Sequence, residues 1–185
     1  MSPLEKYAID NLSAVITLIS GSNINFELVE LSIYEKAIIY EYSNEGFKLI
    51  NQQLRKSKGI NSSKFGKHLE KCLKKLPNYD GLVYRAALLT EDEIKRYSDA
   101  FINNLVLKEY SFISSSKSRL IAMSFLGNVL FRIYSKSGKD IEKISKFGVH
   151  GIPNEKEVLF KPNRNFKVLD VKVEKDFTLI TMDEI

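Results

Sequence analysis

The hydrophobic pattern of this chain changes near Gly81, and that change is the strongest constraint on its fold. Before Gly81, apolar residues recur at spacings of three and four, which is typical of amphipathic helices. After Gly81 come short segments rich in β-branched and aromatic residues, which indicate strands. A run of helices followed by a run of strands favours an α+β fold over an alternating α/β fold.

Four helices are predicted before Gly81. They cover about residues 4–19, 26–42, 47–54 and 62–76. The first ends near Gly21, and the last has Ser62 or Ser63 as its N-cap. The turn-forming residues Pro77 to Gly81 then stop the fourth helix.

Strands dominate the remainder of the chain. The strand-like segments are residues 82–85, 106–113, 129–134, 158–160, 166–173 and 177–181. Thr90 to Glu93 forms a capping box, residues 118–125 are predicted as a short helix, and residues 174–176 as a hairpin turn. No linker-like stretch divides the chain, so we predict one domain over 1–185, with a helical part (1–80) and a sheet-rich part (81–185).

Composition excludes several classes of protein. With 185 residues, of which 44% are apolar and 28% charged, the chain can fill one core, and no apolar run approaches a membrane span of about 20 residues. The N-terminus lacks the layout of a signal peptide. The single cysteine, Cys72, falls on the apolar face of a predicted helix, and the two histidines are far apart, so we predict no metal site.

The net charge of +5 is unevenly distributed, because lysines crowd residues 56–75. A solvated helix face is the simplest interpretation of this lysine-rich segment. It could also attract an acidic protein, membrane headgroups or a nucleic-acid backbone. Aromatic residues are not interleaved with the lysines as a base-stacking platform would require, so nucleic acid is the less favoured partner.

Two carboxylates, Glu155 and Glu157, stand two residues apart at the start of a predicted strand. On a strand, this spacing projects both side chains from one face. Paired acids of this kind suit chemistry at a sugar C1, where one carboxylate stabilises an oxocarbenium-like centre and the other handles a nucleophile. A Glu-Lys-Glu sequence on a half-exposed strand is more often a solvated face, so corroboration must come from elsewhere in the chain.

Three motifs of the sheet-rich part supply it. Tyr84-Arg85, then Phe112 to Ser116, then Glu155 to Phe160 occur in an order that resembles the Arg, Ser-Thr-Ser, Glu-x-Glu signature of the mono-ADP-ribosyltransferase toxins. In the helical part, Tyr42, Phe47, Ile50-Asn51 and Leu54-Arg55 resemble the helix that precedes the first catalytic strand of that family. The resemblance spans about residues 33–171, and it implies a helical layer packed on a mixed, mostly antiparallel core of two sheets.

The resemblance assigns unequal roles to the two acids. It implies that Glu157 binds the 2′-hydroxyl of the nicotinamide ribose and stabilises the charge that develops at C1. Glu155 would position, and can deprotonate, an acceptor guanidinium, which implies arginine modification. Arg85 would bind the NAD pyrophosphate or ribose through its planar fork. Of Ser114 and Ser116, one would orient the catalytic carboxylate and the other would line the nicotinamide pocket.

Further cofactor contacts are implied less directly. Ala86 stands where the family usually has glycine holding the nicotinamide amide, and its methyl group is a small intrusion. Asn51 and Arg55 would face the adenosine side, and Arg132 would be a second phosphate contact. The segment 143–154 resembles the mobile acceptor-recognition loop of the family, where Phe147 would contact the target.

The function implied is transfer of ADP-ribose from NAD to an arginine of a target protein, with release of nicotinamide. One alternative is the same chemistry on a nucleic-acid acceptor, and another is a binding module that keeps the fold without catalysis. The family setting implies a toxin, effector or phage enzyme. Such a protein is secreted or injected without a Sec-type signal to act in the target-cell cytoplasm, or works as a cytoplasmic phage enzyme, and an immunity protein is a possible partner.

Overall fold

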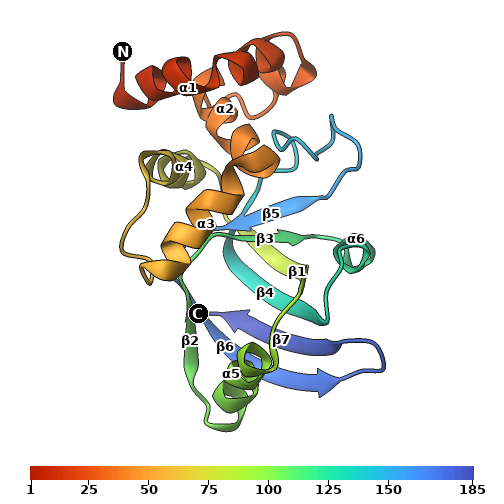
Figure 1. Ribbon diagram of the computed structural model, residues 1–185. Coiled ribbons are helices and arrows are strands. Elements are labelled where there is room, and N and C mark those ends of the chain that lie inside the picture. Colours follow the sequence, from red (N-terminus) through yellow and green to blue (C-terminus); the bar gives the residue numbers. More distant parts are fainter. The chain divides into compact units, whose positions relative to one another are not determined.

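The computed structural model describes residues 1–185 (Figure 1). These residues form two compact units. The helical unit comprises Met1–Pro77 and Lys139–Glu157, and the sheet unit comprises Asn78–Gly138 and Val158–Ile185. The predicted boundary near residue 80 is therefore close to the first crossing between units. The prediction missed that residues 139–157 return to the helical unit, because that return is a tertiary contact without a local sequence signal.

The helical unit holds six helical elements, three of which begin at side-chain caps. They are α1 (Pro3–Ser20), the short 3₁₀-helix η1 (Asn23–Phe26), α2 (Ile33–Glu41), the π-helical turn η2 (Tyr42–Gly46), α3 (Phe47–Lys56) and α4 (Lys64–Lys75). Ser2 and Ser32 form capping boxes with Glu5 and Glu35, and Ser63 caps α4. No helix is long and apolar enough to cross a membrane.

The helix predicted over residues 26–42 is wrong in its first half. The chain leaves η1 at Glu27, Leu28 adopts a positive φ of 44°, and α2 starts only after the cap at Ser32. Leu31 is nevertheless buried, so an apolar residue in an irregular segment continued the helical spacing. Periodicity records which residues are buried and does not distinguish a helix from a turn that buries the same residues.

The sheet unit holds two helices and the strands of a seven-stranded sheet. The strands are β1 (Tyr79–Ala87), β2 (Val106–Glu109), β3 (Ile113–Ser116), β4 (Val129–Asp140), β5 (Glu157–Phe160), β6 (Arg164–Val173) and β7 (Thr178–Glu184). Their order is β1-β3-β5-β4-β7-β6-β2, with an additional pairing of β1 with β4. The pairings of β1 with β3 and β4, and of β6 with β2 and β7, are antiparallel, whereas β4 and β7 run parallel. The predicted α+β class is confirmed.

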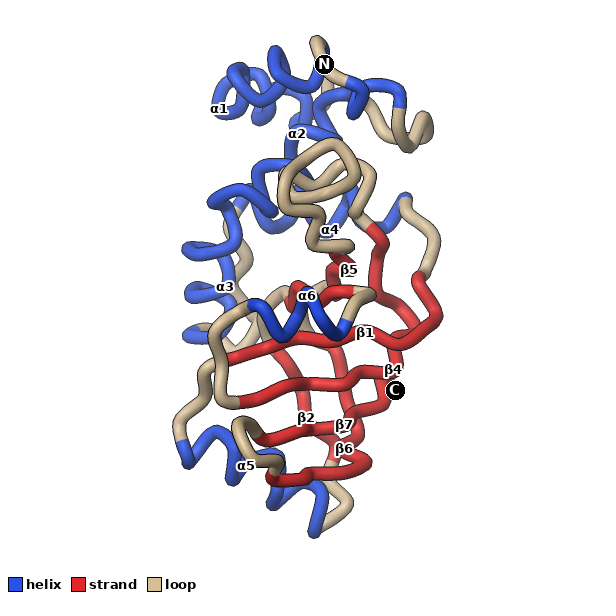
Figure 2. The backbone as a smooth tube through the Cα atoms, turned by 90° about the vertical axis from the view of Figure 1, so that its right-hand side faces the viewer, coloured by secondary structure: helices blue, strands red, loops and turns tan.

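Helices α5 (Glu91–Ile102) and α6 (Arg119–Ser124) pack on the sheet. Figure 2 shows α5 along β6 and α6 beside β1. The capping box predicted at Thr90 and Glu93 starts α5. Tyr97 and Ala100 of α5 belong to the hydrophobic core. The other core residues come mainly from the strands: Val83, Ile113, Val129, Phe131, Ile133, Val158, Phe160, Phe166, Val168, Ile180 and Met182. This apolar layer fixes which side chains of each strand face inward.

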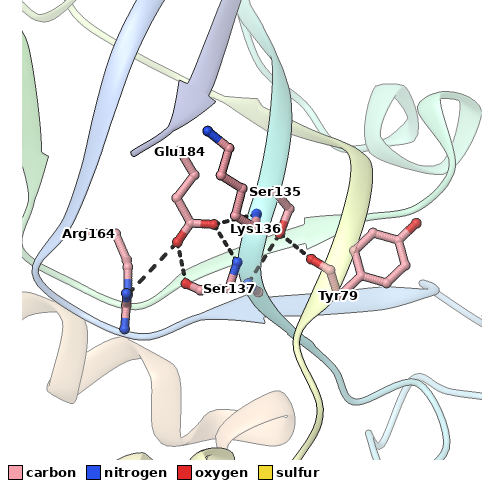
Figure 3. Close-up of polar contacts among 7 residues, drawn as sticks. Tyr79, Ser135, Lys136, Ser137, Arg164 and Glu184 are labelled. Carbon is pink, nitrogen blue, oxygen red and sulfur yellow. Dashed lines mark hydrogen bonds and ion pairs between the residues drawn. The ribbon is translucent and has the colours of Figure 1, made fainter.

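A buried carboxylate, Glu184, ties the end of β7 to β4 (Figure 3). It accepts hydrogen bonds from the backbone N–H groups of Lys136 and Ser137, each at 2.7 Å, and a short one from the Ser137 hydroxyl. The Arg164 Nε lies 3.9 Å from the same carboxylate. Two residues earlier on β4, the Ser135 hydroxyl donates to the Tyr79 carbonyl at 2.9 Å. These contacts hold β4 where it leaves the sheet unit.

Replacement of Glu184 by alanine is expected to lower the free energy of unfolding by about 3 kcal/mol, because it leaves two backbone donors and Arg164 without a buried acceptor. The neighbouring Asp183 is the matched control, since its ion pair with Lys136 is partly exposed and Asp183→Ala should cost below about 1 kcal/mol. Urea unfolding followed by circular dichroism measures both. Equal losses in the two variants would contradict the role of Glu184.

Candidate active site

Glu155 and Glu157 were predicted to project from one face of a strand, but only Glu157 belongs to a strand in the structure. Strand β5 begins at Glu157, so Glu155 lies before the strand. Lys156 between them is exposed and has a left-handed backbone, with φ of 51°, and its N–H donates to the Asn154 side chain at 2.9 Å. The two carboxylates are close enough for the charge of Glu157 to raise the pKa of Glu155. A turn, rather than strand alternation, therefore brings them together.

Glu157 is buried within the helical unit, with 3% of its surface exposed. Its carboxylate accepts a hydrogen bond from the Ser145 hydroxyl at 3.1 Å, and its backbone carbonyl accepts the N–H of Ile141 at 3.1 Å. Ser145 is itself buried. A hydroxyl that holds one carboxylate oxygen restricts the rotamer of that acid and leaves the second oxygen to point elsewhere. Sequence analysis missed Ser145, because a serine in a polar segment gives no local signal.

Glu155 has a pKa raised to about 7, firstly by burial and secondly by the nearby charge of Glu157. A carboxyl with a pKa near 7 exchanges its proton readily at neutral pH, which is the property required of a general base. The two acids thus occupy different environments. The Glu157 carboxylate accepts a hydrogen bond from a hydroxyl, whereas the Glu155 carboxyl has a pKa near neutral pH.

The segment between β4 and β5 is held in place by polar contacts within the helical unit. Its residue Lys146 donates its backbone N–H to the Ser43 hydroxyl at 2.8 Å and its ammonium to the Asn44 side chain. Asn154 donates to Glu142 at 2.7 Å. A side chain at either Gly148 or Gly151 would collide with a backbone carbonyl of the same segment. The acceptor loop predicted by resemblance to be mobile therefore has a tightly packed backbone in this structure.

Phe147, the predicted target contact, is half-buried in that segment. The Lys146 ammonium lies 5.2 Å from the centre of its ring. The Phe147 carbonyl accepts the N–H of Glu155 at 2.7 Å. Its backbone therefore positions Glu155, whichever groups its ring contacts.

Asn51 and Arg55 lie one turn apart on α3, as predicted, and Arg55 is exposed. The amide of Asn51 donates to the hydroxyl of Tyr42 at 3.2 Å. Tyr42 is buried and begins the π-helical turn, and the ring of Phe47 meets it edge-on at 6.4 Å. Such π-turns are frequent at functional sites, because they rotate the helix that follows. Here the turn sets which residues α3 presents.

In the sheet unit, Arg85 and the serine strand are joined directly. The Arg85 guanidinium donates to the Ser114 carbonyl at 2.7 Å. The hydroxyl of Ser115 donates to the Val158 carbonyl at 2.8 Å, and that of Ser116 accepts the N–H of Ser118 at 3.1 Å. The middle serine thus ties β3 to β5, and Ser116 stabilises the start of α6. Arg85 is half-buried with its orientation set by the strand it contacts.

Strand register separates Arg132 from Arg85. Arg132 pairs with Tyr84 on one side and with Thr181 on the other, whereas Arg85 pairs with Phe131. Because paired residues share a face and neighbours alternate, the two arginines project from opposite faces of the sheet. Ala86, two residues from Tyr84, projects on the face of Arg132. The Arg132 Nε and the Thr181 hydroxyl are buried without a hydrogen-bond partner.

Comparison with known proteins relates this chain to one family. Residues 20–185 match the ADP-ribosyltransferase exoenzyme family. Mav of Mycobacterium avium (strain 104) is 32% identical over 173 residues, which are 91% of this chain and 20% of Mav. The NAD(+)–protein-arginine ADP-ribosyltransferase Tre1 of Serratia proteamaculans (strain 568) is 32% identical over 143 residues, which are 76% of this chain and 29% of Tre1.

A solved structure shares the fold. The ADP-ribosyltransferase HopU1 of Pseudomonas syringae pv. tomato DC3000 superposes with a TM-score of 0.78 at 20% identity, over 94% of this chain and 87% of that one. The chain spans less than a third of the length of Mav and of Tre1. The resemblance inferred from the motifs is confirmed, as is the combination of helices with a mostly antiparallel sheet core. The strands join in one seven-stranded sheet, where the resemblance implied two sheets, because β4 pairs with both β1 and β7.

The raised pKa of Glu155 predicts a pH-dependent stability. In the unfolded chain Glu155 ionises near its ordinary value of 4.5, and in the folded protein near 7, so its ionisation costs stability progressively from about pH 4.5 to 7. Glu155→Gln should therefore be more stable than the unsubstituted protein by about 2 kcal/mol at pH 8 and equal to it at pH 4. Urea unfolding at both pH values measures this difference. Glu45→Gln, at an exposed position, is the control and should track the unsubstituted protein.

Proposed function

This chain belongs to the ADP-ribosyltransferase exoenzyme family, and we propose that it transfers ADP-ribose from NAD to an arginine side chain of a target protein. The observation that carries the proposal is the pair of acids in unlike states, Glu157 held by Ser145 and Glu155 with a pKa of about 7. Tre1, which by its name modifies protein arginine with NAD, supports the choice of cosubstrate and acceptor.

The chemistry proposed for the acids follows from their environments. The bond between ribose C1 and the nicotinamide nitrogen breaks, and nicotinamide leaves with the electron pair. The Glu157 carboxylate stabilises the positive charge that develops at C1, and burial strengthens that interaction because little water screens it. A guanidinium nitrogen of the acceptor forms the new bond to C1, and its proton passes to Glu155. The products are nicotinamide, ADP-ribosylated arginine and one proton.

The other residues predicted from the sequence are proposed to contact NAD. Arg85 is proposed to bind the NAD pyrophosphate, and its bond to the Ser114 carbonyl supports a fixed orientation of its fork. Ser114, Ser116, Asn51 and Arg55 are proposed as further NAD contacts. Arg132 and Ala86 are proposed at the phosphates and the nicotinamide amide. Ala86 would act through its backbone, which does not depend on the face of its side chain. Arg132 lies on the sheet face opposite Arg85, so its proposed phosphate contact requires that NAD also reach that face.

The exoenzyme family also supports a proposed setting. We place the activity in the cytoplasm of a target cell, after secretion or injection, with an immunity protein protecting the producer. Induced expression inside Escherichia coli tests whether the activity harms a cell. The chain should stop growth, and its Glu157→Gln variant at equal abundance should not.

Replacing Glu157 or Glu155 by glutamine is predicted to affect nicotinamide release and ADP-ribose transfer to different extents. Glu157→Gln should lose nicotinamide release and transfer to agmatine, a small guanidinium acceptor, by about 1,000-fold, because both need the charge at C1 to be stabilised. Glu155→Gln should keep nicotinamide release within about tenfold while losing transfer by about 100-fold. Chromatography of NAD, nicotinamide and ADP-ribosylated agmatine separates these outcomes. Glu174→Gln, at the hairpin turn, is the control.

Unchanged transfer by Glu157→Gln would overturn the assignment of the catalytic acid. Parallel loss of both reactions in Glu155→Gln would overturn the separate role of the second acid. Labelled product from lysate that resists protease but not nuclease would instead indicate a nucleic-acid acceptor.

Ser145 is predicted to be a positioning residue for Glu157. Ser145→Ala should lower kcat for nicotinamide release by about tenfold with little change in KM for NAD, because it frees the rotamer of the acid without touching the cosubstrate. Steady-state kinetics measure kcat and KM separately, and urea unfolding shows whether the protein remains folded. A rise in KM with unchanged kcat would contradict this role.

A further inference from the structure

Tyr97 of α5 is a buried tyrosine in the core of the sheet unit, with 7% of its surface exposed. Its ring meets the ring of Phe131 edge-on, with 5.1 Å between the ring centres. Its hydroxyl donates to the Glu109 carboxylate at 3.0 Å. Burial of a hydroxyl costs hydration that phenylalanine would not lose, so packing alone does not explain the phenol at this position.

Tyr97 lies beside Arg85. Strand register places Arg85 of β1 opposite Phe131 of β4, and such paired side chains share one face of the sheet with their Cβ atoms about 5 Å apart. Because the Tyr97 ring packs on Phe131, it lies over the same face as Arg85. Burial raises the pKa of the Tyr97 hydroxyl, and the nearby charge of Arg85 is among the effects that oppose this rise.

The bond to Glu109 determines which way the phenol points. A carboxylate only accepts hydrogen bonds, so the Tyr97 proton is directed at Glu109 and the lone pairs of the phenol oxygen face other groups. A guanidinium has only donors, so these lone pairs suit Arg85. The Arg85 fork already donates to the Ser114 carbonyl at 2.7 Å. The phenol oxygen is therefore a second acceptor that restricts the orientation of the fork.

Arg96 holds the charge of Glu109. Its guanidinium lies 3.1 Å from the Glu109 carboxylate and 5.4 Å from the centre of the Tyr97 ring. It also donates to the Lys108 carbonyl at 3.1 Å. Because Arg96 balances Glu109, the group that Tyr97 brings to Arg85 is neutral. A carboxylate there would compete with phosphates for Arg85, whereas a phenol orients the guanidinium and leaves its charge available.

We propose that Tyr97, fixed by Glu109, is a positioning residue that orients the Arg85 fork for the NAD pyrophosphate before NAD binds. The inference rests on the proposed function and adds to it two residues outside the predicted motifs. An arginine oriented beforehand loses less conformational entropy on binding. The contribution of Tyr97 is therefore to the affinity for NAD, and not to cleavage of the bond at C1.

The first test measures the Kd of NAD by calorimetry in the Glu157→Gln background, which should hold NAD with little turnover. Tyr97→Phe keeps the ring and removes the hydroxyl, so it should raise this Kd about fivefold. In the protein with Glu157 intact, it should raise KM for NAD about fivefold and keep kcat within about twofold. Tyr79→Phe is the matched control, since it removes a hydroxyl from another tyrosine packed on the same core, and it should change neither constant.

A second test asks whether Tyr97 acts through Arg85. In the Arg85→Met background, adding Tyr97→Phe should change kcat/KM for nicotinamide release by less than about twofold, because there is no fork left to orient. Glu109→Leu should raise the Kd as Tyr97→Phe does, whereas Glu109→Gln should stay within about twofold of the unsubstituted residue, since its amide oxygen still accepts the phenol proton. Urea unfolding shows whether each variant is folded, and the two Glu109 variants decide the matter if Tyr97→Phe is not.

The positioning role would be overturned by an unchanged Kd in Tyr97→Phe, by an equal rise in Tyr79→Phe, or by a fall in kcat at unchanged KM. An undiminished effect of Tyr97→Phe in the Arg85→Met background would overturn it too, as would equal behaviour of Glu109→Gln and Glu109→Leu. Failure of the unsubstituted protein to release nicotinamide, together with no NAD binding by Glu157→Gln, would instead refute the proposed function.

Discussion

The burial of Glu157 close to a second carboxylate is the constraint on which the site depends. Two acids in a water-poor place repel each other and lose hydration, and the raised pKa of Glu155 records both costs. The surrounding chain offsets them. Ser145 holds one carboxylate by its hydroxyl, and the carbonyl of Phe147 holds the backbone of the other. Separate tethers place the two acids in unlike environments, and unlike environments suit them to unlike roles.

The same contacts explain why the segment between β4 and β5 is so closely packed. A loop that moved freely would let Glu155 reach water, and its pKa would return toward the ordinary value. Polar bonds to Ser43, Asn44 and Glu27 fasten this segment to the helical unit. The electrostatics of the two acids thus depend on the backbone of this segment.

Much of the fold was predictable because it is local. Caps at Ser63 and Thr90 begin helices where the sequence indicated. The strands follow the β-branched and aromatic runs, except that the predicted strand 106–113 is divided into the end of β2 at Glu109 and the start of β3 at Ile113. The errors arose where a residue is buried by segments distant in the sequence. Leu31 imitated a helical residue in an irregular segment, and residues 139–157 joined the helical unit. Local spacing carries no information about either contact.

The sequence by itself determined the family and the types of side chain available for chemistry, since the motifs of Arg85, the serine strand and Glu157 survive as an ordered pattern. Tertiary structure decided how they are used. It selected Ser145 as the partner of Glu157, bonded Ser43 to Lys146 across 103 residues, and paired Glu27 with His150 across 123. Strand register placed Arg132 on the face opposite Arg85. Hydrogen bonds and ion pairs act over a few ångströms of space, so partners distant in sequence are defined only once the chain has folded.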